Sequence, residues 1–229
     1  MIFKEGIKLN TTEFVQSIDG ADYISWSAAV ALAGRPHQKV RCFGGLPYLS
    51  FFDGAVVCIE QYLPAEERVQ ETWLPVLDAK MAPVPMDRLD PRMINDTIMR
   101  ARAKAIAMIN GVGISIYAGY GGNAMTFVKA LGLTPESDLS KVQPLESKKN
   151  GRAEYVSWAA ALAAARLTDP SFTWRVNFSE ALDWHTGEIK NLPVISMPGG
   201  YMVSVSVTYK GEEHTELLPI MGIGQVHTK

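Results

Sequence analysis

Positively charged side chains are concentrated in the stretch from Lys80 to Lys104, where their chemistry suits a polyanion. Six basic residues lie there against three acidic ones, a local excess of three positive charges. Lysine and arginine at such density are typical of surfaces that follow a phosphate backbone. Any such site must be local, because the chain has 22 basic and 24 acidic residues and a formal net charge of −2. The basic residues of the stretch are Lys80, Arg88, Arg92, Arg100, Arg102 and Lys104.

The second half of this stretch is predicted to form a long amphipathic helix from Arg92 to Asn110. Asp90 followed by Pro91 is a typical helix start, because the carboxylate caps free amides and the fixed φ of proline suits the first turn. Gly111 is a typical helix end. The apolar stripe of the helix consists of Ile94, Ile98, Ala101, Ala105, Met108 and Ile109.

Basic residues are expected on both sides of this apolar stripe. At about 100° per residue, Arg100 and Lys104 lie on one side and Arg102 lies on the other. The outward face carries Ala103 and Ala107, which are small enough to let another backbone approach closely. An ordinary amphipathic helix with solvated basic side chains remains the alternative.

A second basic pair, Lys39 and Arg41, is predicted to lie on a strand. Both residues point to the same side, because they alternate with Val40 and Cys42. A strand surface with cations and rings suits single-stranded nucleic acid, since rings stack on bases while cations hold the backbone. The alternative is a core of aromatic residues with the cations in water. The aromatic residues that follow the pair are Phe43, Tyr48, Phe51 and Phe52.

Sequence signals for an enzyme are weak. The four histidines are scattered without metal-ligand spacing, and the motifs of nucleophile elbows, phosphate-binding loops and zinc helices are absent from the sequence. The glycines between residues 111 and 122 miss the dinucleotide-binding fingerprint and are interpreted as a helix stop and turns. We therefore expect no catalytic residue, no metal site and no cofactor.

The composition favours a folded protein with two core-bearing units. The chain has 229 residues, of which 47% are apolar and 20% charged, as in ordinary globular proteins. No apolar run approaches the roughly 18 to 20 residues of a membrane-spanning helix, and Lys4, Glu5 and Lys8 interrupt the region of a signal peptide. The only cysteines are Cys42 and Cys58, which fits a reducing compartment. We expect a cytoplasmic protein with no membrane contact.

An internal repeat is visible in the sequence. Residues 23–33 read YISWSAAVALA and residues 155–165 read YVSWAAALAAA, with seven of eleven positions identical. Each copy is predicted to begin with a short helix capped by a serine, followed by antiparallel strands. The clearest hairpin of the second copy turns at Lys210-Gly211. Its surface near Trp174 and Arg175 has more acidic neighbours, so we expect it to bind a polyanion less well.

The repeat also predicts the domain organisation. The offset between the copies grows from 132 to 146 residues, which predicts an insertion of about fourteen residues around residues 179–190. We expect an α+β fold, in which antiparallel sheet is covered by helices. The predicted units are a complete one at 1–125, a linker at 126–153 with a short helix near residues 126–131, and a partial repeat at 154–229 that lacks the long basic helix.

Several strings of this sequence together resemble the Sak-type phage single-strand annealing proteins, a branch related to the strand-annealing mediators of the Rad-fifty-two superfamily. The strings are YISW, GGLPY, LPVLD and INDTIMRARAKAIAMINGVGISIYAG. The similarity covers roughly residues 20–120, and residues 154–222 resemble its first part again. The implied fold is an annealing-protein core of ββ(β)α type with a tandem partial duplication.

The resemblance implies a non-enzymatic protein that binds and anneals single-stranded DNA without ATP, as a homo-oligomeric ring or filament in a bacterial host cell. The resemblance is also compatible with a further partner, a single-strand-binding protein of the phage or the host. By position, the basic helix residues of the family correspond to Arg100 and Lys104. Arg102 stands where the family usually has an apolar or cysteine-like residue. The expected nucleic-acid-binding residues are Arg100, Lys104, Arg102, Arg92, Lys39 and Arg41.

Two other functions remain as alternatives. The first is a protein-interaction or assembly module of the same fold that has lost DNA binding, a hypothesis based on the negative net charge and the duplicated half-unit. The second is a small-ligand enzyme that uses the glycine-rich segment from residue 111 to 122. Binding of oligonucleotide, assembly without DNA, and nucleotide-dependent stabilisation distinguish the three.

Overall fold

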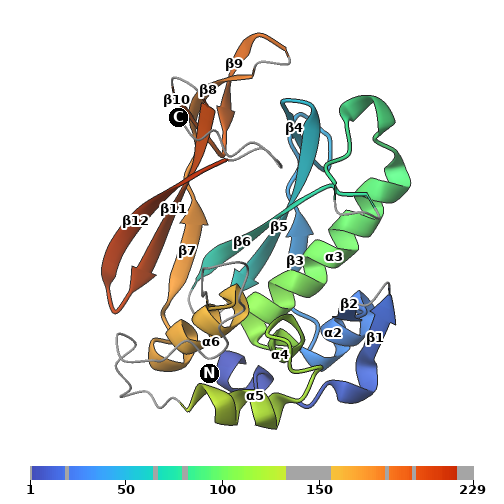
Figure 1. The fold of residues 1–229 in the computed structure, drawn as a ribbon, viewed down its shortest axis with the longest axis vertical. Coiled ribbons are helices and arrows are strands. Elements are labelled where there is room, and N and C mark those ends of the chain that lie inside the picture. The colour runs from blue at the N-terminus through green and yellow to red at the C-terminus, as the bar shows by residue number, and fades with distance from the viewer. Residues whose placement is uncertain are drawn as a thin grey trace, which may run out of the picture.

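The protein combines antiparallel sheets with a long helix and a layer of short helices, as the ribbon in Figure 1 shows. The α+β class expected from the sequence is therefore confirmed. The computed structural model describes residues 2–18, 21–63, 67–78, 82–132, 156–183, 186–197 and 200–220.

The first four-stranded sheet is built around the ten-residue strand β5, Gly54–Leu63. Strand β6 (Arg68–Pro75) pairs along one edge of β5. Strands β3 (Gln38–Val40) and β4 (Leu49–Phe51) pair with different segments of β5. Alternate residues of β5 are buried on the side that faces the long helix, as its period-two pattern requires: Ala55, Val57, Ile59, Gln61 and Leu63.

The long helix α3, Pro91–Asn110, lies across this sheet (Figure 1). It begins one residue before the predicted Arg92 and ends at the predicted Asn110. The Asp90 side chain accepts a hydrogen bond from the amide of Met93 at 2.9 Å. Gly111 ends the helix in the left-handed conformation, with φ of 79°. Ala101, Ala105 and Ile109 pack into one core cluster with the buried side chains of the sheet.

A layer of short elements covers the opposite side of α3. It consists of α1 (Ile2–Gly6), α2 (Trp26–Leu32), α4 (Ile114–Tyr117) and α5 (Ala124–Leu131), together with the hairpin of β1 (Val15–Ile18) and β2 (Ala21–Ile24). The small residues on the outward face of α3 are buried beneath this layer: Ala103 and Ala107.

Contact between α1 and the end of α3 is close enough to require glycine. A Cβ atom at Gly6 would lie 1.8 Å from the carbonyl oxygen of Asn110, and one at Gly111 would lie 2.7 Å from the carbonyl oxygen of Phe3. Such separations are far below van der Waals contact. The two glycines therefore let the helix backbones touch.

The second four-stranded sheet has the same pairing arrangement as the first. Its central strand is β11 (Gly200–Tyr209), with β12 (Glu212–Pro219) on one edge. Strands β7 (Thr173–Val176) and β10 (Ile195–Met197) also pair with β11, along different segments of it. The predicted turn at Lys210-Gly211 is confirmed, with φ of 51° and 82°.

The predicted insertion is a hairpin of its own. Strands β8 (Ser179–Asp183) and β9 (Glu188–Leu192) pair antiparallel, at the place where the offset between the repeats changes. The hairpin contacts the first sheet, because the Asp183 carboxylate accepts a hydrogen bond from the amide of Phe52 at 3.1 Å. The Phe52 and Tyr201 rings lie 4.4 Å apart between centroids.

The helix of the second repeat, α6 (Trp158–Thr168), packs against the N-terminal half of the protein. Ala159, Ala160 and Ala163 share a core cluster with residues of α1, α3, α4 and α5. The expectation that each unit carries its own core therefore requires correction. The physical reason is that α6 is an alanine-rich helix with few large side chains, and it can bury its apolar face only against the layer around α3.

The two sheets lie side by side, with β7 next to β6 (Figure 1). The Gln70 side chain donates a hydrogen bond to the carbonyl oxygen of Trp174 at 2.7 Å and so joins the neighbouring strands. Helix α5 spans the predicted boundary between the first unit and the linker, and its side chains Phe127 and Leu131 are buried. The rest of the predicted linker, from residue 133 to 153, lies outside the described residues.

Candidate nucleic-acid interface

Arg100 and Lys104 lie one turn apart on α3, on the flank that faces α4 and α6. The Lys104 ammonium lies 4.9 Å from the ring centroid of Trp158, the first residue of α6. Tyr117, at the end of α4, contacts the same indole, with ring centroids 5.3 Å apart. The flank therefore joins two cations with two aromatic rings from three helices.

The electrostatics of this flank favour an anion. Burial lowers the pKa of Lys104 below its usual value, and the positive charge of Arg100 lowers the pKa further. Burial also raises the pKa of Tyr117 to about 12, although Arg100 acts in the opposite direction. Two like charges held together on a half-buried surface repel one another. A phosphate group between them would relieve this repulsion.

Arg102 points to the other flank of α3, as the helical spacing predicts. Its guanidinium carbon lies 5.4 Å from the ring centroid of Trp26, the first residue of α2. The buried Nε of Arg102 and Nε1 of Trp26 have no hydrogen-bond partner among the described residues. Arg102 is thus held beneath an indole, half-buried and separated from the Arg100 and Lys104 side chains by the helix itself.

The two tryptophans occupy equivalent places in the sequence repeat. Trp26 follows Ser25, which caps α2 through a hydrogen bond from the amide of Ala28 at 3.3 Å. Trp158 follows Ser157, which caps α6 in the same way through Ala160 at 3.2 Å. The repeated motif therefore places an indole against a cation on each flank of α3, which sequence reasoning did not predict.

The remaining expected residues lie elsewhere. Arg92 is on the first turn of α3, with 90% of its side chain exposed, and its Nε lies 3.9 Å from the carboxylate of Asp96. Lys39 is exposed on β3 and lies opposite Glu60 of β5. The preceding residue, Gln38, faces α3, since its side chain donates a hydrogen bond to the carbonyl oxygen of Arg102 at 3.1 Å. Lys39 therefore points away from α3.

Arg41 lies within a cluster of carboxylates and rings on the far face of the first sheet. Its guanidinium forms ion pairs with Glu60 and Glu71. It also lies 5.3 Å from the ring centroid of Phe43 and 5.8 Å from that of Phe178. The structure therefore does not bring Lys39 and Arg41 together with Arg100 and Lys104 in one surface.

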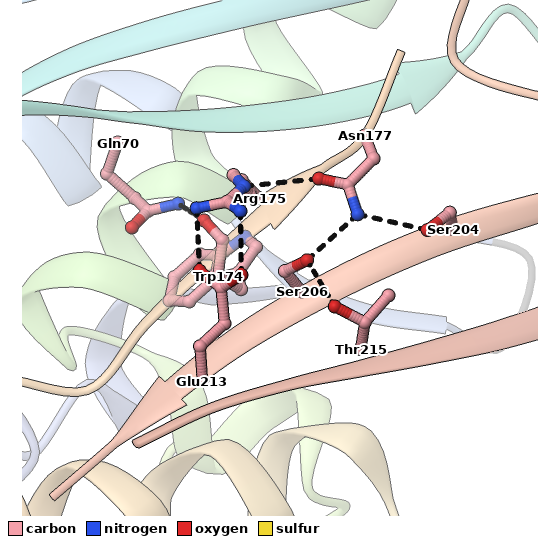
Figure 2. Close-up of polar contacts among 8 residues, drawn as sticks. All are labelled: Gln70, Trp174, Arg175, Asn177, Ser204, Ser206, Glu213 and Thr215. Atoms are coloured by element: carbon pink, nitrogen blue, oxygen red, sulfur yellow. Dashed lines mark hydrogen bonds and ion pairs between the residues drawn. The ribbon is translucent and has the colours of Figure 1, made fainter. Parts of the chain in front are cut away.

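The second sheet carries a polar network around β7, which is drawn in Figure 2. Arg175 of β7 forms an ion pair with Glu213 of β12 at 2.8 Å. The Asn177 side chain donates to the hydroxyl groups of Ser204 and Ser206, at 2.9 and 2.8 Å. Arg175 is thus engaged by an acidic neighbour, in accordance with the acidic character expected for this surface.

Another cation that the sequence reasoning missed is Arg166 of α6. It is 3% exposed and donates to the carbonyl oxygen of Ile109 at 3.4 Å, near the end of α3. Its guanidinium also lies 5.2 Å from the ring centroid of Trp174. A cation near the C-terminal end of a helix is stabilised by the helix dipole, so Arg166 helps to fix α6 against α3.

The described residues contain no cluster of three or more histidine, cysteine, aspartate or glutamate side chains that could hold a metal ion. In the same part of the chain, none of the helices combines the length and the hydropathy that crossing a membrane requires.

Comparison with known proteins identifies the family of the segment that contains α3. The family model described as Sak Single Strand Annealing Protein matches residues 10–122. No curated protein and no solved structure matches the chain significantly. The matched residues run from the start of the β1–β2 region through α4, and include Arg100, Lys104 and Trp26. The segment of residues 10–122 thus matches the Sak family of single-strand annealing proteins.

Proposed function

We propose that this protein binds single-stranded DNA and anneals complementary strands, without ATP and as a homo-oligomer in the cytoplasm of a bacterial host cell. The observation that carries the proposal is the Arg100 and Lys104 pair on α3, inside the segment that matches the Sak family. Annealing requires no bond to be broken. It requires a surface that holds phosphates and leaves the base edges free to pair.

Within this proposal the six basic residues contribute unequally. Arg100 and Lys104 form the main phosphate contact, because they are adjacent and repel one another. Arg92 and Lys39 are exposed and add weaker contacts. Arg102 is stacked on Trp26 and Arg41 is paired with two carboxylates, so both contribute least.

The experiment that tests the proposal is the double substitution Arg100→Ala/Lys104→Ala, with oligothymidine binding measured at several salt concentrations. For single strands the slope of log affinity against log salt is about −0.7 per phosphate contacted. We expect weaker binding and a slope that is shallower by about 1.4. An unchanged affinity and slope in a folded variant would refute the proposed contact.

A matched control removes the same charge from the second sheet. Arg175 is paired with Glu213, and Lys210 is exposed in the β11–β12 turn. Arg175→Ala/Lys210→Ala should leave the slope near that of the wild type. This control separates a local contact from a general effect of net charge.

We also propose that the chain arose by tandem partial duplication, with units at 1–125 and 154–229 and a linker between them. The common pairing arrangement of the two sheets and the two serine-capped helices support this proposal. Assembly into a ring or filament would multiply a weak phosphate contact along one strand. A single-strand-binding protein of phage or host that loads the strand belongs to the same proposal.

An assembly module that has lost DNA binding is the second candidate. The observation that favours it is the edge strand β12, whose eight residues are all exposed, including Leu217 at 49% and Leu218 at 69%. Exposed edge strands of this kind pair readily with other chains. Light scattering with and without oligonucleotide distinguishes the two candidates. An assembly state that does not change when oligonucleotide is added favours the assembly module.

A further inference from the structure

The Trp158 indole is exposed although two side chains already contact it. Its residue is 41% exposed to solvent, while the Lys104 ammonium lies 4.9 Å from its ring centroid and the Tyr117 ring lies 5.3 Å away. An exposed tryptophan normally costs solvation energy. Part of this ring therefore remains available to another flat apolar surface, directly beside the cationic flank of α3.

The equivalent indole of the first repeat does not have this property. Trp26 is only partly exposed, and its ring nitrogen is buried. Both rings contact a cation of the same helix, so the cation contact alone does not explain why Trp158 is more exposed to solvent than Trp26. The difference makes Trp158 the ring suited to an external partner.

The chemistry around Trp158 selects the class of partner. Arg100 and Lys104 lie on the same flank and suit a phosphate, while an aromatic face suits a nucleobase. Adjacent phosphate and base positions in one strand would place both contacts within a single nucleotide unit. Stacking on a base face also leaves the Watson–Crick edge of that base free.

We propose that Trp158 is a base-stacking platform, on which one nucleobase of the bound strand lies while Arg100 and Lys104 hold its phosphate. The proposal rests on the proposed binding of single-stranded DNA. It assigns a direct part of that binding to the second repeat, since Trp158 lies beyond the segment that matches the family. The second repeat then completes the interface rather than only extending the fold.

The test compares two oligomers that have equal charge but differ in their bases. One is oligothymidine and the other is a strand of abasic sites with the same number of phosphates. Stacking contributes about 1 to 3 kcal/mol per base, so Trp158→Ala should weaken oligothymidine binding by a factor of about 5 to 150. The same variant should bind the abasic strand as the wild type does, with an unchanged salt slope.

Further variants keep the test decisive. Trp158→Phe should retain most of the affinity for oligothymidine, because it keeps an aromatic face. Ile189→Ala removes an apolar residue that is 73% exposed on the β8–β9 hairpin, and should change neither affinity. Arg100→Ala/Lys104→Ala should weaken binding of both strands.

Each outcome separates this inference from the proposed function. Loss of affinity for both strands in Trp158→Ala would show a structural role and overturn the stacking proposal alone. An unchanged affinity for oligothymidine would overturn it as well. If the wild-type protein binds neither strand, both the inference and the proposed function fail.

Discussion

At the residue scale, the central side chain is Lys104, which is held half-buried beside another cation. Its pKa is lower in the folded chain than in the unfolded chain, first because of burial and then because of Arg100. The charged form therefore costs stability. This cost is complete below the folded pKa and disappears as the pH rises toward the unfolded value of 10.5.

This electrostatic cost predicts a measurable titration. The pKa of Lys104, followed by NMR of its side-chain nitrogen, should lie below 10.5 and should rise when Arg100 is replaced by alanine. Lys104→Met should be no less stable than the wild type at neutral pH, because it removes a charge that is costly to bury. A Lys104 pKa at or above its ordinary value would contradict the assigned environment.

The two cysteines give a second prediction at this scale. Cys42 is exposed, whereas Cys58 is buried in the centre of β5. Burial, reinforced by the nearby Glu71 carboxylate, raises the pKa of Cys58 and suppresses its reactive thiolate. A thiol reagent should modify Cys42 alone in the native protein and both residues in denaturant. Equal rates for the two thiols under native conditions would be inconsistent with this fold.

At the scale of the element, α3 was predictable because its signals are local. Asp90, Pro91 and Gly111 fix its ends within the sequence itself, and the structure agrees. The opposite flanks of Arg100 and Arg102 follow from helical geometry in the same way. Their partners did not follow, because Trp26 and Trp158 reach α3 through packing between segments far apart in the chain.

The N-terminal cap of α3 gives a prediction at the element scale. Asp90→Ala removes the side chain that accepts from the Met93 amide, and should lower the free energy of unfolding by about 1 kcal/mol. Asp96→Ala removes an exposed carboxylate from the same helix and should change it by less than about 0.5 kcal/mol. Urea unfolding measures both, and equal effects would argue against the cap.

At the scale of the whole molecule, the sequence indicated two repeats but not how they share a core. The repeat and the insertion are visible as offsets between similar strings. The packing of α6 against the layer around α3 was not predictable, because alanine-rich helices do not specify their partner. For the same reason, the participation of Trp158 in the basic flank became visible only in the fold.

The shared core predicts that both sheets unfold together. Tryptophan fluorescence and far-ultraviolet circular dichroism should report one coincident transition. Gln70→Leu removes the side chain that donates a hydrogen bond to the carbonyl oxygen of Trp174, and should lower the free energy of unfolding by about 1 to 3 kcal/mol. Gln16→Leu, at an exposed position of β1, serves as the control. Two separate transitions would contradict a common core.

The most direct test of the account is the rate at which the purified protein anneals two complementary labelled oligonucleotides without ATP. The wild-type protein should accelerate duplex formation over the spontaneous rate, and Arg175→Ala/Lys210→Ala should do the same. Arg100→Ala/Lys104→Ala should lose this acceleration while remaining folded. A wild-type protein that leaves the rate unchanged, or a double variant as active as the wild type, would contradict the proposed role of α3.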